Sequence, residues 1–581
     1  MGTAALRLAA LVVVCMPVAA GAQGVEPSAC TEGVISRVEL DRRSVFDPES
    51  TEVGALQWTY RALNLLHVRT AESFIRRELL FEEGDCFDPF LASESQRLLE
   101  TYGFLAQVSV TDADDGEDGR RMRVSTQDEW STQVALGVTY DGGFNVERFS
   151  VAETNFLGQG IFAQFSHRDR RETKSRSLGL TTPRFFGRSD AGIEWSQGRT
   201  GHVFDQYVRY PFVGETGRTA LRQGYSHRTD FFTYSAEGTE AFTHTLVPAY
   251  RELAEFSAAR RYGEPGALVV AGISLTRDVV QFPVAPQVAF DEDFDDLEPF
   301  SSALPQSLSD QLQPGASTRV AFHLGARRQR YVEYEGLDGV RDRMLVSLGM
   351  FAGLTLGRGF SVLTPEGVPG VDDYFGRVRG SFGVPVGSSI LHGSFTVESR
   401  RDAGAWKDVL ADADVVGYLR NGALRGHTLF VRASMAGGWN TTLPFQVRLG
   451  GREGVRSLVE DRFPGGRMAR FVVEDRIAFP WPPSRQLDLG LTAFGDLGRV
   501  WTGDAPFTVD SGWQAALGIG LRIGFPAGTR NVWRTDVAFP VGPTGGSPIF
   551  RVTFEFNRMR NGFFTPDVSR SRRFNTGPDY F

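Results

Sequence analysis

The sequence predicts a protein built mostly of antiparallel β-strands, preceded by a small domain of mixed α and β structure. From about Ser131 to Asn557, apolar residues alternate with polar or small ones, which is the period of a strand with one apolar face. The 581 residues include 66 glycines and 45 phenylalanines, which suit the turns and girdles of a β-barrel, although a β-sandwich would share them. The net charge of -8 is mild and the basic residues form no stripe, so nucleic acid is not an expected partner.

Residues 1–22 have the pattern of a secretory signal peptide. Arg7 precedes an apolar run from Leu8 to Val18, and Ala20-Gly21-Ala22 supplies a cleavage site. Cys15 lies in this run, and the residues before it do not fit a lipoprotein box, so we interpret it as an ordinary signal residue. No later segment has about eighteen apolar residues in a row. An exported chain of this kind is expected to be either soluble and secreted or an outer-membrane barrel.

Residues 23–129 predict a small α+β domain. The expected order is strand, helix, helix, strand, strand, with Thr70 as a possible N-cap of the first helix. Residues 44–69 are long for a connection and contain a helix-like run, so we interpret them as an insertion. The expected elements are Val34–Leu40, Ala71–Leu80, Leu91–Tyr102, Phe104–Val110 and Arg121–Ser125.

Cys30 and Cys86 are the two cysteines that remain after cleavage. An exported protein meets an oxidising compartment, where an even number of cysteines favours a disulfide. We therefore predict that the two are joined. The alternative is a pair of buried free thiols.

Residues 130–557 contain roughly sixteen to twenty candidate strands. A membrane barrel needs this alternation because lipid lies outside and water inside, but the strands of a soluble sandwich alternate as well. The stretch Val279–Ala316 is rich in Asp, Pro and Ser and is expected to be a long outward loop, and residues 558–581 form a polar, Arg-rich tail. Clear examples of alternating strands are Val134–Tyr140, Trp513–Gly524 and Phe550–Phe556.

The segment from Leu449 to Trp501 organises this region. In Leu487–Asp496, every second residue is apolar, and the opposite face is polar or small apart from Phe494. Before the strands comes Gly450–Arg467, which has too many charges for a membrane core and too many glycines for a helix. A charged loop beside strands with polar faces predicts a loop that folds back into a barrel lumen.

These residues resemble the motifs of the BamA/TamA superfamily of outer-membrane assembly and secretion proteins, also called the bacterial surface antigen family. Gly450-Gly451, followed by Val455-Arg456, resembles the GG…VRGF/Y loop. Phe494, Asp496 and Gly498 match the F-x-D-x-G strand motif, and Glu474 stands where the intervening strand commonly has a Glu. Ser457 and Leu458 replace the Gly and the aromatic residue of the family loop, but the Arg that carries the family's interaction is kept.

The resemblance implies a fold and a location. It implies an outer-membrane barrel of about sixteen strands, with residues 23–129 as a POTRA-like domain in the periplasm. Glu153–Gly160 resembles the N-x-x-G-x-G hairpin near the start of these barrels. In the family, a weakly paired seam joins the first and last strands, which here are Ser131–Asp141 and Ile549–Asn557.

The resemblance also implies a function, which is insertion of proteins into the outer membrane or their translocation across it, without enzymatic chemistry or a cofactor. The expected partners are unfolded outer-membrane or secreted client proteins, the lipid bilayer, and accessory factors in the periplasm or on lipoproteins. Three alternatives stay open: a two-partner secretion pore, a passive diffusion porin, and a soluble exported β-protein.

No motif for catalysis or metal binding stands out. The eight His residues lack metal-ligand spacing, and the acidic stretch Asp291–Asp296 departs from a calcium loop at Asp296 and Ser302. The remaining site hypothesis is that Arg456 pairs with Asp496, with Glu474 close by. The alternative is three independent lumen residues in water. Asp475 faces away from them, which indicates either a position near the membrane interface or an error in register.

Overall fold

A computed structural model of the chain describes residues 30–556. Its gaps are 31, 47–56, 59–60, 62–63, 65–66, 115–118, 141–143, 169–174, 200, 238–241, 292–293, 295, 301–302, 421–425, 452–453, 460–461, 482–486, 526, 530 and 543–546. The expected signal peptide, the C-terminal tail and most of the expected insertion lie outside the described residues. No helix in the described part of the chain is long and apolar enough to cross a membrane.

The N-terminal unit, residues 30–128, has its elements in the predicted order. They are β1 (Val34–Arg43), α2 (Glu72–Glu78), α3 (Pro89–Glu100), β2 (Leu105–Asp114) and β3 (Gly119–Asp128). The sheet order is β1-β3-β2, with β1 parallel and β2 antiparallel to β3. The helices pack on this sheet through an apolar core that includes Phe74, Ile75, Leu99 and Met122.

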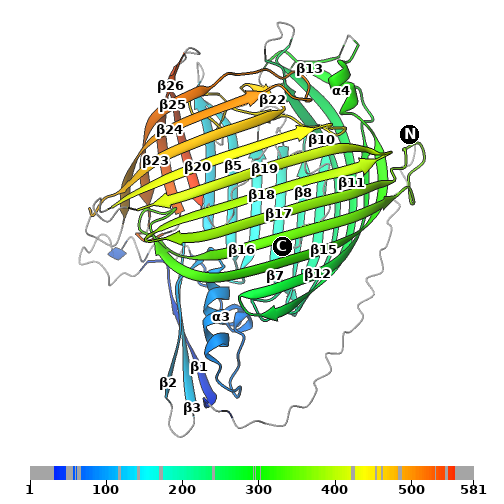
Figure 1. Cartoon of the computed structure of the whole chain (residues 1–581). Coiled ribbons are helices and arrows are strands. Elements are labelled where there is room, and N and C mark those ends of the chain that lie inside the picture. The colour runs from blue at the N-terminus through cyan, green and yellow to red at the C-terminus, as the bar shows by residue number, and fades with distance from the viewer. Residues whose placement is uncertain are drawn as a thin grey trace, which may run out of the picture.

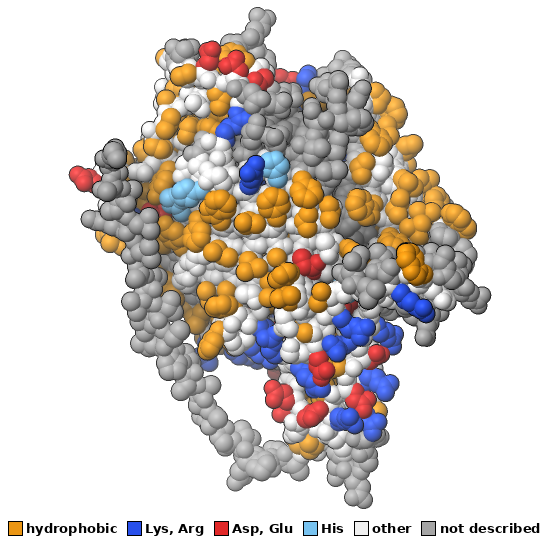
Figure 2. Space-filling view, turned by 180° about the vertical axis from the view of Figure 1, so that it is seen from behind, with side chains coloured by type: hydrophobic (Ala, Val, Ile, Leu, Met, Phe, Trp, Pro, Cys, Tyr) orange, Lys and Arg blue, Asp and Glu red, His pale blue; other side chains and the backbone are white. Residues whose placement is uncertain are grey.

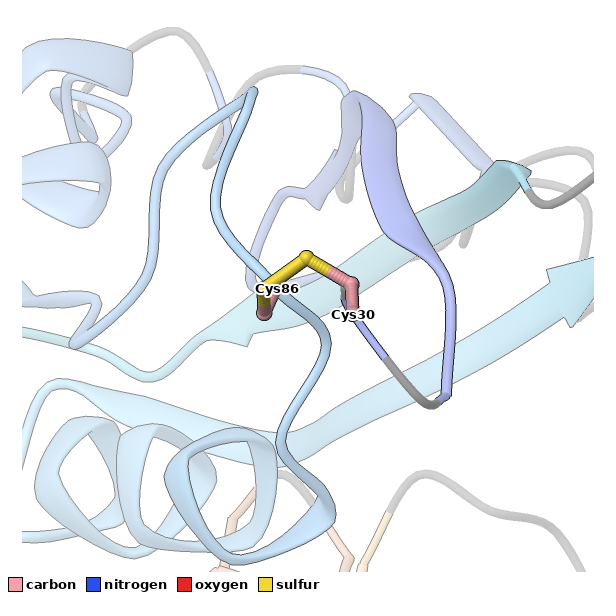
Figure 3. The surroundings of a disulfide bond; sticks show 2 residues. All are labelled: Cys30 and Cys86. Atoms are coloured by element: carbon pink, nitrogen blue, oxygen red, sulfur yellow. A yellow bond between two sulfur atoms is a disulfide. The ribbon is translucent and has the colours of Figure 1, made fainter. Parts of the chain in front are cut away.

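Two local features of this unit concern predictions from the sequence. Cys30 and Cys86 form a disulfide that ties the segment before β1 to the connection between the helices (Figure 3). Thr70 is not an N-cap, because Ala71 occupies that position. Instead, Thr70 is fully buried and its hydroxyl donates to the carboxylate of Asp128 over 2.7 Å.

Between residues 132 and 556, the described part of the chain forms a barrel of twenty long antiparallel strands (Figure 1). The expected number of about sixteen is therefore wrong, and twenty is the upper end of the candidates in the sequence. Nineteen antiparallel ladders join the strands in chain order from β4 to β27. The first strand, β4, and the last strand, β27, are also neighbours in the strand order, and the boundary between them is called the seam. The strands are β4 (Thr132–Tyr140), β5 (Phe144–Phe156), β6 (Ile161–Arg168), β7 (Ser175–Phe186), β8 (Ser189–Gln197), β9 (His202–Tyr210), β10 (Thr219–Ser235), β11 (His244–Glu264), β12 (Ala267–Gln281), β15 (Gly315–Glu335), β16 (Arg343–Phe360), β17 (Asp373–Val386), β18 (Ser389–Asp402), β19 (Ala405–Leu419), β20 (His427–Trp439), β23 (Arg467–Ala478), β24 (Asp488–Trp501), β25 (Gln514–Gly524), β26 (Asn531–Val541) and β27 (Ile549–Phe556).

The two ends of the barrel differ. The N-terminal unit packs against one end, here called the near end, where the chain turns tightly, as at 187–188 and 265–266. The longest connections, 282–314 and 440–466, lie at the far end. The first contains β13 (Gln287–Ala289), β14 (Leu297–Pro299) and α4 (Gln306–Asp310), so the expected loop Val279–Ala316 carries short elements between longer strands. The second contains β21 (Val447–Arg448) and β22 (Pro464–Gly465).

The barrel wall is apolar outside and polar inside. In β24, Asp488, Thr492 and Asp496 are buried, whereas Leu491 and Leu497 are exposed. Figure 2 shows hydrophobic side chains spread over the barrel wall and charged side chains gathered on the N-terminal unit. An exposed apolar surface of this extent is unusual for a soluble protein. This inside-out pattern is that of a transmembrane barrel.

Candidate functional site

The loop 440–466, which joins β20 to β23, folds back from the far end into the lumen. Its two short strands, β21 and β22, pair with each other at its base. Beyond them, Leu449, Val455, Leu458 and Phe463 are buried in one apolar cluster together with wall residues such as Met468. The loop therefore has its own packed core, which holds it against one side of the barrel.

Glycines allow the loop to lie so close to the wall. A Cβ on Gly450 would lie 1.9 Å from the carbonyl oxygen of Val459, and Gly451 has a φ of +94°, which favours glycine. On β24, a Cβ on Gly498 would come within 2.6 Å of the Leu449 side chain and 3.1 Å of Val455. The two predicted loop glycines and the strand glycine thus have direct steric roles.

Arg456 projects from this loop onto β24 and β23. Its Nε and Nη2 atoms donate to the two carboxylate oxygens of Asp496 over 2.8 and 2.6 Å, and its backbone N–H donates to the same carboxylate over 3.0 Å. Its Nη1 atom donates to Glu474 over 2.7 Å. A planar guanidinium with a fork of donors fits this arrangement, and an ammonium group would not.

Phe494 is the one aromatic residue on the polar face of β24, and its contact with Arg456 accounts for its position there. Its ring lies beneath Arg456, with 3.5 Å between the guanidinium carbon and the ring centroid. A cation over an aromatic face is attracted by the ring quadrupole, more strongly where water is excluded. Phe494 is therefore part of the site, and it is buried inside the lumen.

Three further charged residues complete the cluster, and sequence reasoning did not assign them to it. Arg476 and Arg534 both donate to Glu474, over 3.0 and 3.1 Å, and Arg534 also donates to Asp536 over 2.8 Å. The cluster then holds three guanidinium groups and three carboxylates, and a fourth carboxylate, that of Asp338, lies 3.6 Å from Arg476. Each buried charge therefore has a partner of opposite charge. Arg534 and Asp536 share the inward face of β26, and that alternation is the signal that could have found them.

Ser457 and Leu458, the two residues at which the loop differs from the motif that it resembles, have separate surroundings. Leu458 stands in place of the aromatic residue and packs in the loop's apolar cluster. Its carbonyl oxygen accepts a hydrogen bond of 3.0 Å from Arg551 on β27. Ser457, in place of the Gly, is buried, and its hydroxyl has no hydrogen-bond partner among the described residues. Through the hydrogen bond between Leu458 and Arg551, the lumen loop is bonded to the last strand of the barrel.

Asp475 lies outside the lumen, on the half-exposed surface near the start of β20. Its carboxylate is 2.9 Å from Nδ1 of His427. Both residues lie close to the point where their strands reach the near end of the barrel. The register of β23 therefore agrees with the alternation in the sequence, and the position of Asp475 near the membrane interface stays a prediction.

The hairpin segment Glu153–Gly160, which comprises the end of β5 and the turn into β6, docks the N-terminal unit. The amide of Asn155 donates to the hydroxyl of Thr70 over 2.8 Å, and its oxygen accepts from the N–H of Gly160 over 2.8 Å. Gly158 accepts a backbone hydrogen bond of 2.8 Å from Ala71. A Cβ on Gly158 would lie 2.5 Å from the carbonyl oxygen of Arg69, so the close approach requires glycine.

A buried ion pair adds to this docking. Nε and Nη2 of Arg184, on β7, donate to the two carboxylate oxygens of Glu78, on α2, each over 2.6 Å. Both side chains are almost completely buried. Arg184 has a positive φ of 59° next to a register shift in β7, which turns its side chain toward the unit.

A cavity of about 1150 Å³, lined by both polar and apolar residues, opens at the far end, between α4, the start of β15 and the turn from β18 to β19. Most of its charged lining residues form ion pairs, such as Asp402 with Lys407 at 2.7 Å. Within the described ranges, no group of three or more His, Cys, Asp or Glu side chains is arranged to hold a metal ion. The acidic stretch 291–296 lies partly outside those ranges.

No protein-family model matches the chain, and no curated protein matches it in sequence. Among solved structures, it is similar to BamA from Haemophilus ducreyi lacking POTRA domains 1–3, at 13% identity and a TM-score of 0.38, covering 90% of this chain and 83% of that one. It is similar to CdiB from Escherichia coli at 13% identity and a TM-score of 0.40, covering 90% and 76%. CdiB from Acinetobacter baumannii gives 10% identity and a TM-score of 0.32, covering 90% and 73%.

Proposed function

We propose that the chain is an outer-membrane barrel of the BamA/TamA type that helps other proteins to insert into the outer membrane or to cross it. The observation that carries this proposal is the lumen loop, which Arg456 binds to Asp496 and Glu474 and which Leu458 links to β27. A loop bonded to both the inner wall and the last strand can couple the lumen to the seam.

The orientation of the barrel in the membrane follows from the difference between its two ends. Outer-membrane barrels favour short turns on the periplasmic side and long loops outside. The tight turns lie beside the N-terminal unit, so this unit is the POTRA-like domain in the periplasm. The proposed extents are 1–22 for the signal peptide, 23–129 for this domain with its insertion at 44–69, 130–557 for the barrel and 558–581 for the tail.

Client strands would enter at the seam between β4 and β27. An exposed strand edge offers unpaired N–H and C=O groups, to which an extended client segment can add by β-augmentation. The bond from Arg551 to Leu458 holds the lumen loop next to β27, one of the two strands at this seam. Unfolded outer-membrane or secreted proteins are the proposed clients, with periplasmic or lipoprotein factors as accessory partners. No step in this mechanism uses covalent chemistry.

A passive diffusion porin fits less well. Buried glutamines tie the far-end loops together, because Gln446 bonds to Ser235 and Pro506, and Gln311 bonds to Tyr234 and Phe445. With loop 440–466 inside the lumen, free diffusion would have to break these contacts. A two-partner secretion pore remains the second candidate, since the same loop could leave the lumen during secretion.

Depletion of the protein, followed by comparison of the outer-membrane proteome, tests the proposal. Loss of many barrel proteins indicates a general insertase, and loss of one exported protein indicates a dedicated transporter. An unchanged proteome would contradict the proposal. Complementation with Arg456→Ala and with Arg343→Ala supplies a matched pair, because Arg343 is an exposed rim arginine outside the site. Only the second variant should restore the wild-type proteome.

A further inference from the structure

The turn 336–342, between β15 and β16 at the near end, is buried within the barrel. Leu337, Val340 and Asp342 are each at most 7% exposed, whereas a Cβ on Gly187 or Gly387, in other turns at this end, would meet nothing within 4 Å. Leu337 belongs to an apolar cluster whose other members come from β16, β18, β19, β20 and β23. A residue that packs against so many strands lies inside the ring.

The turn is anchored on the opposite wall of the barrel. Tyr418, on β19, donates its hydroxyl proton to Asp338 over 2.5 Å, and Arg522, on β25, donates to the carbonyl oxygen of Asp338. Nε of Arg341 donates to Asp488, on β24, over 2.5 Å. The turn starts from β15 and is bonded as far round the ring as β25. It therefore crosses the lumen.

One pair of residues joins this turn to the loop that enters from the far end. Nη1 of Arg476 donates to the carbonyl oxygen of Leu337 over 2.7 Å, and its Nε donates to Glu474 over 3.0 Å. Glu474 in turn accepts from Arg456 of loop 440–466 over 2.7 Å. Arg476 and Glu474 are two positions apart on the inward face of β23. An unbroken chain of charged hydrogen bonds therefore runs from one inserted segment to the other.

We propose that the turn 336–342 is a second plug of the barrel and that the pair Glu474–Arg476 couples it to loop 440–466, so that release of either segment loosens the other. Residues that share a partner in one ionic network are energetically coupled, whereas distant independent residues are not. Loop 440–466 closes the lumen from the far end and the turn closes it from the near end. Opening of the lumen then requires both to move, which is a property of the barrel and does not depend on the identity of its clients.

Ion conductance of the full-length protein in planar bilayers measures the sealing directly. Arg341→Ala removes the anchor on Asp488 without touching Glu474 or Arg476, and Arg456→Ala releases the far-end loop. Each should raise the open probability by at least about tenfold, which corresponds to a loss of about 1.4 kcal/mol of anchoring free energy. Arg343→Ala, at the exposed end of the same turn, should conduct as the wild type does. Heat-dependent gel mobility confirms that each variant has folded.

The combined variant Arg341→Ala/Arg456→Ala tests the coupling. Its fold-increase in open probability should be clearly smaller than the product of the fold-increases of the two single variants. A charge exchange, Arg341→Asp with Asp488→Arg, should restore the seal that either single exchange breaks. Wild-type conductance of Arg341→Ala, or single effects that multiply, would overturn the proposal. Because no client protein is present, these results are independent of the test of protein insertion.

Discussion

Arg456 and Asp496 are joined by three hydrogen bonds, two from the guanidinium group at 2.8 and 2.6 Å and one from the backbone N–H at 3.0 Å. One carboxylate on the wall thus fixes both the side chain and the main chain of the lumen loop. Both side chains are largely buried, and breaking such a pair typically costs about 3–5 kcal/mol. The position of the loop therefore depends on this contact more than on any exposed ion pair.

Arg456→Lys should restore only part of the function that Arg456→Ala loses. Lysine keeps the charge, but it cannot bind two carboxylates and lie flat on Phe494 with the same geometry. We expect client insertion into liposomes to fall between the values for the wild type and the alanine variant. Full activity of the lysine variant would show that charge alone is sufficient and that the fork of donors is not used.

Gly498→Ala should displace the loop without removing a charged group. The added Cβ would meet Leu449 and Val455, and crowding of a packed core costs about 1–3 kcal/mol. Gly376→Ala on β17 is the matched control, because nothing lies within 4 Å of its added Cβ. Protease accessibility of loop 440–466 should rise in the first variant only. Equal accessibility in both variants would argue against close packing at Gly498.

The contact between the N-terminal unit and the barrel should depend on Glu78. Glu78→Ala leaves Arg184 buried without its partner, at a cost of about 3–5 kcal/mol. Glu72→Ala, on the same helix, breaks only the exposed pair with Arg76 and should have no measurable effect. The distance between spin labels on the unit and on the barrel should broaden for Glu78→Ala alone. An unchanged distribution would mean that other contacts hold the unit.

Removal of the disulfide should destabilise the N-terminal unit and leave the barrel intact. Cys30 and Cys86 are 56 positions apart, and closing a loop of that size stabilises by about 4 kcal/mol in the chain-entropy model. Cys30→Ser/Cys86→Ser should therefore make the unit sensitive to protease at lower denaturant concentration. The gel mobility of the heat-modifiable barrel should not change. Two alkylatable thiols in fresh wild-type protein would contradict this account.

The seam between β4 and β27 should have to open during client insertion. Each backbone hydrogen bond that is broken costs about 1 kcal/mol, so a weakly paired seam lowers the barrier. Cysteine pairs placed across the two strands should cross-link, and oxidation should stop insertion while the barrel stays folded. Reduction should restore activity. Full activity of the cross-linked protein would exclude the mechanism.

Alternation along the chain was sufficient to predict the strands and their faces. It placed the polar face of Leu487–Asp496 opposite its apolar face, and in the structure that polar face is buried in the lumen. The strand number was less accessible, because alternation allowed sixteen to twenty candidate strands and the family resemblance favoured sixteen, whereas the described residues form twenty.

The partners of Glu474 show where sequence reasoning ends. Arg476 lies two positions away on the same face, but Arg534 is 60 positions away on β26, and pairing between strands that are not neighbours cannot be read from alternation. Thr70 shows the opposite failure. Its type and position fit a helix cap, yet its hydroxyl donates to the buried carboxylate of Asp128 and accepts from the amide of Asn155, so it makes no cap hydrogen bond.

A double-mutant cycle on Arg456 and Asp496 tests the central claim most directly. We expect Arg456→Ala and Asp496→Ala to lower client insertion and the free energy of unfolding by similar amounts, and the double variant to be little worse than either. The coupling free energy should then be close to the cost of either single change, about 3–5 kcal/mol. The exposed pair Arg499 and Asp510, which involves the same strand, serves as control and should give additive effects. Strict additivity for Arg456 and Asp496 would show that the two residues act independently and would contradict the account.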